Sequence, residues 1–111
     1  MKDIGKLLYG KLNSVAPTYP LVAENTTSFP FIIYRTTAVR PTDTKDGIYE
    51  WVYNAQINVV SNRYDEVVEL CNQVLDKLVE LEGVLDINIS EVSESFAEDA
   101  YIREINIIIK L

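Results

Sequence analysis

Histidine is missing from this sequence altogether, and cysteine occurs once, at Cys71. Without histidine the chain lacks the commonest general base near neutral pH, the usual activator of a serine or cysteine nucleophile and the commonest nitrogen ligand of a metal ion. A single cysteine forms no disulfide within the chain and leaves a structural zinc site without its ligands. We therefore expect no catalytic residues, no metal site and no cofactor.

Glycine, proline and long apolar runs are also scarce. The 111 residues include four Gly and four Pro, too few for a disordered or fibrous chain. No apolar run approaches the roughly 20 residues that cross a bilayer, and the segment Met1–Gly5 lacks the apolar stretch of a signal peptide. We expect a single domain over residues 1–111 that is intracellular, unprocessed and without a membrane partner.

Positive charge is scarce in the second half of the chain. Met1–Arg63 holds seven Lys/Arg and five Asp/Glu, a balance of +2, whereas Tyr64–Leu111 holds three and twelve, a balance of −9. Together these halves give the net charge of −7. Because nucleic-acid affinity comes largely from Lys and Arg that displace counterions from phosphates, an acidic half of this size argues against tight binding of DNA or RNA.

Two segments carry apolar residues at the spacing of an amphipathic helix. The first is Ile4–Val15, and Pro17 ends it. The second is preceded by Ser61 and Asn62, either of which can cap a helix. The apolar stripe of this second helix consists of Tyr64, Val67, Val68, Cys71, Val74, Leu75 and Leu78.

Alternation of apolar with polar residues, or a β-branched and aromatic composition, predicts the strands. They are Phe29–Val39, Ile48–Val60, Leu85–Ser90 and Tyr101–Leu111, with at most one further short strand around Leu21–Ala23. Arg40–Gly47 is expected to be a projecting loop, and the acidic Glu91–Asp99 stretch a loop or part of a long hairpin. The predicted fold is α+β, a mostly antiparallel sheet of four to five strands with two helices packed on one face, in the order α-(β)-β-β-α-β-β.

Each predicted helix has one apolar stripe, so the sheet keeps an uncovered face. In the predicted strand Phe29–Val39 both alternate sets of residues are apolar. The set that begins with Ile32 is assigned to the uncovered face. The uncovered face is then predicted to carry Ile32, Tyr34, Ala38, Ile48, Val52, Val60, Ile102 and Ile108. Apolar patches of this kind, like the seven tyrosines of the chain, are typical of protein contacts.

Carboxylates are the remaining chemical resource. Glu66, Glu69, Asp76 and Glu80 share a polar helix face, which we interpret as solvated. A hydrolase or isomerase that uses carboxylates alone would need two acids converging in a pocket. The Glu91–Asp99 stretch lacks the alternating ligands and central glycine of a calcium loop. The only thiol lies on the apolar stripe of the second helix, so we interpret it as packed and inert rather than reactive.

Three local patterns resemble the tail-completion or head-to-tail joining family of long-tailed bacteriophages, whose members also occur in prophages. Phe29-Pro30-Phe31-Ile32-Ile33-Tyr34 is similar to the family's proline-led strand after a variable loop. Tyr53-Asn54-Ala55-Gln56-Ile57-Asn58-Val59 and Tyr64-Asp65-Glu66-Val67 resemble the passage from its long strand into its main helix. The resemblance spans most of the chain, but Arg40–Gly47 and the strongly acidic Glu91–Asp99 depart from the pattern.

This resemblance implies a structural virion protein, not an enzyme, that forms a ring, often hexameric, to complete the tail and dock it to the head connector. Its partners would be further copies of the chain, tail-tube proteins and head-connector proteins. It would reside in the virion, and in the host bacterial cytoplasm during assembly. The alternative left open is a monomeric or dimeric protein-binding adaptor that forms no ring.

Two sets of residues are candidates for the assembly role. The candidate interface residues are Ile32, Tyr34, Arg40, Asp43, Lys45, Trp51, Val52 and Tyr53. For Trp51 and Tyr53 a plain place in the core stays open as an alternative, because both share the core-facing alternation. The candidate channel residues are Glu66, Glu69, Asp76 and Glu80, whose negative charge would keep passing DNA from sticking.

Overall fold

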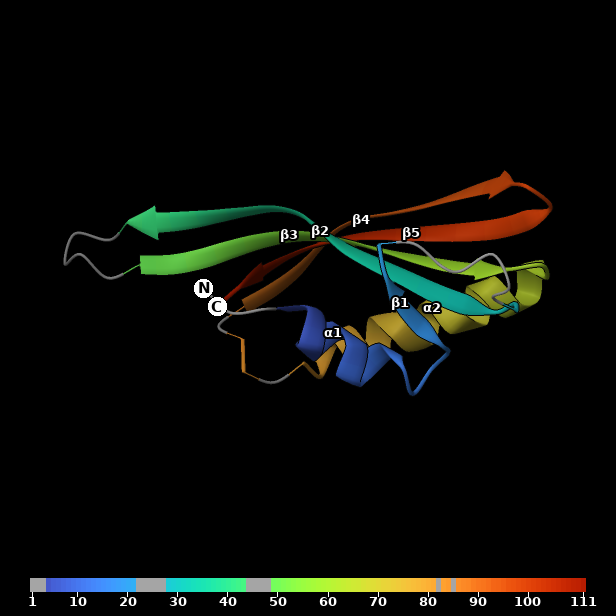
Figure 1. Ribbon diagram of the computed structural model, residues 1–111, viewed down its shortest axis with the longest axis horizontal. Coiled ribbons are helices and arrows are strands. Elements are labelled where there is room, and N and C mark those ends of the chain that lie inside the picture. The colour runs from blue at the N-terminus through green and yellow to red at the C-terminus, as the bar shows by residue number, and fades with distance from the viewer. Residues whose placement is uncertain (1–3, 22–27, 44–48, 82, 85) are drawn as a thin grey trace.

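Figure 1 shows the computed structural model, which describes residues 4–21, 28–43, 49–81, 83–84 and 86–111. Within these residues two helices and five strands follow one another along the chain. Their bounds are α1 (Ile4–Leu12), β1 (Thr18–Pro20), β2 (Phe31–Asp43), β3 (Tyr49–Ser61), α2 (Tyr64–Val79), β4 (Asp86–Ala97) and β5 (Ala100–Lys110). This is the order of elements that the sequence predicts.

The strands form one sheet in the order β1-β2-β3-β5-β4. β1 runs parallel to β2, and every other pair of neighbours is antiparallel. Both helices lie on the same side of the sheet (Figure 1). The predicted class, an α+β fold with a mostly antiparallel sheet and its helices on one face, is therefore confirmed.

The core fills the space between the sheet and the helices. β3 and β5 lie at the centre, and their alternate residues point toward the helices, where apolar side chains are removed from water together. The buried apolar side chains of these two strands and of the helices are Ile4, Leu8, Leu12, Tyr53, Ala55, Ile57, Val59, Val67, Cys71, Val74, Leu78, Ile105, Ile107 and Ile109. The predicted apolar stripes of both helices thus supply the interior of the protein.

The molecule is elongated, with extents of 51 × 24 × 23 Å. Two hairpins that point in opposite directions produce the long dimension (Figure 1). The outer part of the β2–β3 hairpin extends beyond both helices at one end, and the β4–β5 hairpin turns at the other. Each end of the sheet therefore presents a hairpin to its surroundings.

The N-terminal segment differs in its boundaries from the prediction. α1 ends at Leu12 rather than Val15, and β1 occupies Thr18–Pro20 rather than Leu21–Ala23. Leu21 has a φ of 64°, in the left-handed region, so the extended backbone of the strand ends before it. Positions 22 and 23 lie outside the described residues.

Two stretches predicted as polar connections are largely strand. β2 continues through Arg40 to Asp43, and the rest of the predicted Arg40–Gly47 loop lies outside the described residues. β4 runs through most of Glu91–Asp99, and the turn after it contains Glu98 and Asp99, both with positive φ. Of the two alternatives for this stretch, the long hairpin is therefore correct. The sequence leaves both alternatives open because this part of β4 is an edge strand exposed on both faces, and Val92 and Phe96 are its only large apolar residues.

The predicted assignment of faces is wrong in the first half of β2. Ile32 is 0% exposed and lies on the helix side, as does Tyr34 two residues later. A β-bulge between Thr36 and Ala38 then shifts the alternation by one residue, so Ala38 faces away from the helices as predicted. Because both alternate sets in this strand are apolar, the sequence pattern contains no signal for the bulge.

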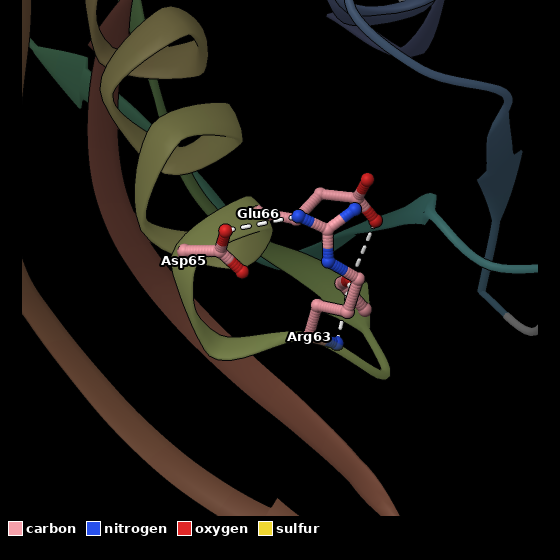
Figure 2. A network of polar contacts seen from close by, with 4 residues as sticks. Arg63, Asp65 and Glu66 are labelled. Carbon is pink, nitrogen blue, oxygen red and sulfur yellow. Dashed lines mark hydrogen bonds and ion pairs between the residues drawn. The ribbon is translucent and has the colours of Figure 1, made fainter.

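The start of α2 is held by a serine that is not its cap. The N-cap residue is Arg63, which makes no side-chain capping bond, so the predicted caps Ser61 and Asn62 are wrong in position. The Ser61 Oγ nevertheless accepts a hydrogen bond from the Arg63 backbone N–H at 3.1 Å and donates one to the Glu66 Oε1 at 2.6 Å (Figure 2). The Arg63 Nη2 also lies 2.9 Å from the Asp65 Oδ2. The hydrogen bond from Arg63 lowers the pKa of the Asp65 carboxyl.

Candidate assembly surfaces

Four of the candidate interface residues point toward the helices. Ile32 and Tyr53 are 0% and 2% exposed, so both belong to the core, and this burial contradicts their predicted contact with another subunit. For Tyr53 the core alternative is the correct one. Tyr34 and Trp51 are half-buried and pack against the core from its edge. A partner could reach only the exposed parts of these two rings.

Two of the other candidate interface residues, Arg40 and Val52, lie on β2 and β3, where those strands still pair with the rest of the sheet. Arg40 is exposed, and Val52, its partner across the strand pair, is half-buried. Both lie on the sheet face turned away from the helices, which we call the outer face. The side chain of Asp43 and all of Lys45 lie outside the described residues. A contact between this hairpin and another protein stays a prediction.

The centre of the outer face is polar rather than apolar. The Arg35 Nε donates a hydrogen bond to the Gln56 Oε1 at 3.0 Å, and the Asn106 Nδ2 donates one to the Glu104 Oε2 at 3.3 Å. The side chains of this polar centre are Arg35, Asn54, Gln56, Asn58, Glu104 and Asn106. The predicted apolar face is thus interrupted in its middle.

Apolar side chains of the outer face gather instead beside the turn of the β4–β5 hairpin. They line a hollow of about 350 Å³, at whose border the rings of Phe29 and Phe31 stack with their centroids 5.7 Å apart. Residues lining this outer hollow include Phe29, Phe31, Ile33, Val60, Ala97 and Ile102. The surplus of outward apolar groups is therefore real, but it is concentrated at one end of the sheet.

A second hollow lies on the helix side of the same hairpin, beside the start of α2. Its volume is about 270 Å³, and the ring of Tyr101 contacts those of Tyr64 and Phe96 at centroid distances of 5.4 and 4.9 Å. The Arg103 Nη2 lies 2.9 Å from the Glu94 Oε2, and its guanidinium lies over the Tyr64 ring. Phe96 is 59% and Tyr64 49% exposed, and aromatic surface left in water in this way is typical of a contact site.

The sequence leaves a loop and a long hairpin open for Glu91–Asp99, and only the hairpin brings the residues of this aromatic hollow together. The available signal is that Val92, Glu94 and Phe96 recur at every second position. In a strand, residues at that spacing share a face, which here is the helix side. A strand at this position places Phe96 beside Tyr101, which the structure shows.

The acidic set on α2 lies where the sequence places it. Glu69, Asp76 and Glu80 are exposed, and Glu66 is half-buried beside Ser61. Spacings of three, seven and four residues align these carboxylates along one side of the helix and its C-cap, Glu80. We call this set the acidic stripe. Its position beside a channel stays a prediction.

The described residues contain no group of three or more His, Cys, Asp or Glu side chains placed to hold a metal ion. No helix among them is long and apolar enough to cross a membrane. Cys71 is 1% exposed, and burial raises the pKa of its thiol, which confirms that this cysteine is packed in the core.

The described residues form a small α+β protein with an elongated sheet, the outer hollow and the aromatic hollow. No model of a protein family matches the chain, and no curated protein matches it. Among solved structures, a chain from the virion of a native gene transfer agent (GTA) particle has a similar fold, with a TM-score of 0.74 and 13% sequence identity. The match covers 93% of this chain and 90% of that chain, so the likeness extends over the whole fold.

Proposed function

We propose that this protein is a structural component of a phage-type virion, in which its copies form a ring that completes the tail and joins it to the head connector. The observation that carries the proposal is the fold shared with a chain of a virion particle over nearly the whole of both chains. Since the two chains are only 13% identical, the match by itself concerns the fold. Support for the role comes in addition from the surfaces of this chain.

The two hollows at the β4–β5 hairpin support an assembly role. They leave Phe29, Tyr64 and Phe96 more than a third exposed on opposite faces of one hairpin. Contact with a neighbouring protein would remove such rings from water, at roughly 25 cal/mol for each Å² of apolar surface covered. The acidic Glu98 at the border of the outer hollow favours a neutral or basic partner surface.

The β2–β3 hairpin supports the role in a second way. Its outer part has no helix beneath it (Figure 1), so this part of the sheet contributes little to the core of its own chain. A two-stranded arm of this kind can reach an adjacent subunit or a neighbouring virion protein. Of the interface candidates, Asp43 of β2 lies on this arm, whereas Arg40 and Val52 lie at its base, where Val52 also pairs with Lys110 of β5.

We place the acidic stripe of α2 on the channel of the ring. Negative charge there would repel passing DNA and prevent it from sticking. The test is a variant in which Glu69, Asp76 and Glu80 are changed to Gln, Asn and Gln, which leaves the Glu66–Ser61 hydrogen bond in place. The fold should remain intact by circular dichroism, while adhesion of DNA at low salt increases. Unchanged adhesion would remove support for this placement.

The ring itself is tested by light scattering and negative-stain electron microscopy of the purified chain at micromolar concentration. We expect a uniform assembly with a central opening. Co-expression with the tail-tube and head-connector proteins of the same gene cluster should give a complex that contains all three. A monomer or dimer at every concentration, with or without those proteins, would instead favour the adaptor alternative.

A further inference from the structure

The sheet has two open edges. Beyond β4 no further strand lies among the described residues, and β1 pairs with β2 only from Ile32 to Tyr34. The whole length of β4, and β2 from Arg35 onward, therefore present a strand edge that no other described strand covers. Edges of this kind are templates for pairing with a strand of another chain.

The two open edges run in opposite directions. β2, β3, β5 and β4 are each antiparallel to the next, so β4 is antiparallel to β2 across the sheet. Copies placed side by side in the same orientation would bring β4 of one copy next to β2 of the following copy as an antiparallel pair. Such a contact joins two different surfaces, and its repetition around an axis closes a ring.

Charges at the two edges are matched across the outer face. Two transverse rows of side chains each begin with an arginine on β2 and end with a carboxylate on β4. The rows are Arg35, Gln56, Asn106, Glu91 and Arg40, Val52, Lys110, Asp86. On the outer face β2 therefore carries two positive charges at its edge, and β4 carries two negative charges at the same levels.

We propose that β4 of one copy pairs with β2 of a second copy, with Glu91 opposite Arg35 and Asp86 opposite Arg40. One register satisfies both ion pairs, because five positions separate the charges on each strand (40 − 35 and 91 − 86). The inference rests on the proposed ring and names the surface that builds it. Opposite charges placed across an antiparallel pair stabilise it and specify its register.

Both edge strands have a bulge next to the same transverse row, which contains Thr36, Ala55, Ile107 and Ile89. Thr37, the bulged residue of β2, donates its hydroxyl to the carbonyl of Asn54 at 3.1 Å. Ser90, the bulged residue of β4, donates its hydroxyl to the carbonyl of Asn106 at 3.0 Å. Each bulge adds one residue between the two charges of its strand, so the charge spacing stays equal on both edges.

The backbone directions agree with this register. Trp51 exchanges two backbone hydrogen bonds with Leu111, so its N–H and C=O groups point away from β2. Pro41, its partner on β2, therefore points its backbone carbonyl toward the open edge. By the same alternation, the backbone N–H and C=O groups of Val39 and of Ile87 point toward the open edges of their strands. The proposed register places these two residues opposite each other. Pro41 lacks an N–H, but it falls opposite position 85, before β4 begins, and interrupts no pairing.

β1 limits the pairing to the first half of β4. It covers β2 as far as Tyr34, the position that this register places opposite Val92. The pairing therefore uses residues 86–91, and β4 leaves the neighbouring copy after Glu91, because the bulge at Ser90 bends the strand. Val92–Ala97 and the aromatic hollow are left for a different contact.

Like charges disfavour the symmetric pairings. β4 carries Asp86, Glu91 and Glu94 and no Lys or Arg, so two β4 edges would place carboxylates against carboxylates. Two β2 edges would bring Arg35 and Arg40 against their own copies. The complementary pairing with a second copy is the arrangement that the charges select.

The first test reverses one charge at a time and measures assembly by light scattering over a concentration series. Glu91→Arg and Arg35→Glu should each raise the concentration of half-assembly about tenfold, because a like-charge contact replaces an opposite pair at every interface. The double variant should assemble like the wild type. Glu69→Arg, an equal reversal on the exposed acidic stripe, is the matched control and should leave assembly unchanged.

The second test cross-links the two strands. Ala38→Cys and Asn88→Cys fall opposite each other in the proposed register, and both positions are exposed on the outer face. Combined in one chain that also carries Cys71→Ala, they should form covalent ladders under mild oxidation. Ala38→Cys with Ser93→Cys, five positions out of register, is the matched control and should remain monomeric on a denaturing gel.

Failure of this inference and failure of the proposed ring give different results. Wild-type rings that persist in both single reversals, together with no in-register cross-link, would overturn the edge pairing and leave the ring intact. A wild-type chain that stays monomeric at every concentration and forms no cross-link would overturn both.

Discussion

The hydroxyl of Ser61 donates a hydrogen bond to the Glu66 Oε1 at 2.6 Å, and Ser61 is fully buried. The Ser61 Oγ also accepts a hydrogen bond from the Arg63 N–H, so the side chain of Ser61 joins the end of β3 to the first turn of α2 (Figure 2). This connection fixes the angle at which α2 leaves the sheet. The apolar residues of α2 belong to the core, so this connection helps to hold α2 against the sheet.

Ser61→Ala should therefore destabilise the protein measurably. The change leaves the Arg63 N–H and the half-buried Glu66 without this partner, and an unsatisfied buried group costs about 1–3 kcal/mol. The free energy of unfolding in urea measures the effect. Ser90→Ala, which removes an exposed hydroxyl hydrogen bond, is the matched control and should lose less. Equal losses in the two variants would contradict a structural role for Ser61.

The central strands should be far more sensitive to truncation than the edge strand. Ile57→Ala removes a side chain of β3 that is 0% exposed, and deletions of this kind cost about 2–5 kcal/mol because a cavity remains. Val92→Ala removes a side chain of β4 that is 40% exposed and should cost less than about 1 kcal/mol. Urea unfolding of both variants provides the comparison. A loss at Val92 that equals the loss at Ile57 would show that β4 belongs to the cooperative core.

Burial of Cys71 predicts a pH dependence of stability. Because burial raises the pKa of this thiol, the folded protein keeps the proton at a pH where the unfolded chain has lost it. The associated stability is fully present below the ordinary cysteine pKa and is lost as the pH rises through the raised value. Between about pH 7 and pH 10 the free energy of unfolding should fall more steeply in the wild type than in Cys71→Ala. Parallel pH profiles would show that the thiol is accessible.

The class of the fold and the helical stripes follow from the sequence because each rests on a repeated pattern. Val67, Val74 and Leu78 recur at helical spacing, and Ile105, Ile107 and Ile109 alternate on one side of a strand. Their burial is what makes the elements stable, so the pattern and the structure have a common cause. Both sets are fully buried as expected.

The sequence pattern does not predict which residues of β2 face the helices or how far β4 extends. In β2 both alternate sets are apolar and a bulge at Thr37 shifts the register, so Ile32 was assigned to the wrong face. In β4 the strand between Glu91 and Ala97 is exposed on both faces and is held by its backbone pairing with β5. Backbone hydrogen bonds leave no pattern in the side chains. The aromatic hollow, built partly from Phe96, is not predicted because the one side-chain signal, Val92 and Phe96 on the same alternate set, is interrupted by Glu94.

Phe96 provides a test of whether the aromatic hollow serves assembly rather than stability. Its ring is 59% exposed, so Phe96→Ser should change the free energy of unfolding by less than about 1 kcal/mol. If the hollow is a contact site, the same change should raise the concentration of half-assembly roughly tenfold or more, because truncating an aromatic anchor commonly costs an interface about 2 kcal/mol. Light scattering and urea unfolding of one preparation separate the two effects. Tyr9→Ser, at a ring that is 45% exposed on α1, is the matched control and should alter neither quantity. Assembly as tight as that of the wild type in Phe96→Ser would show that the hollow stays uncovered in the ring.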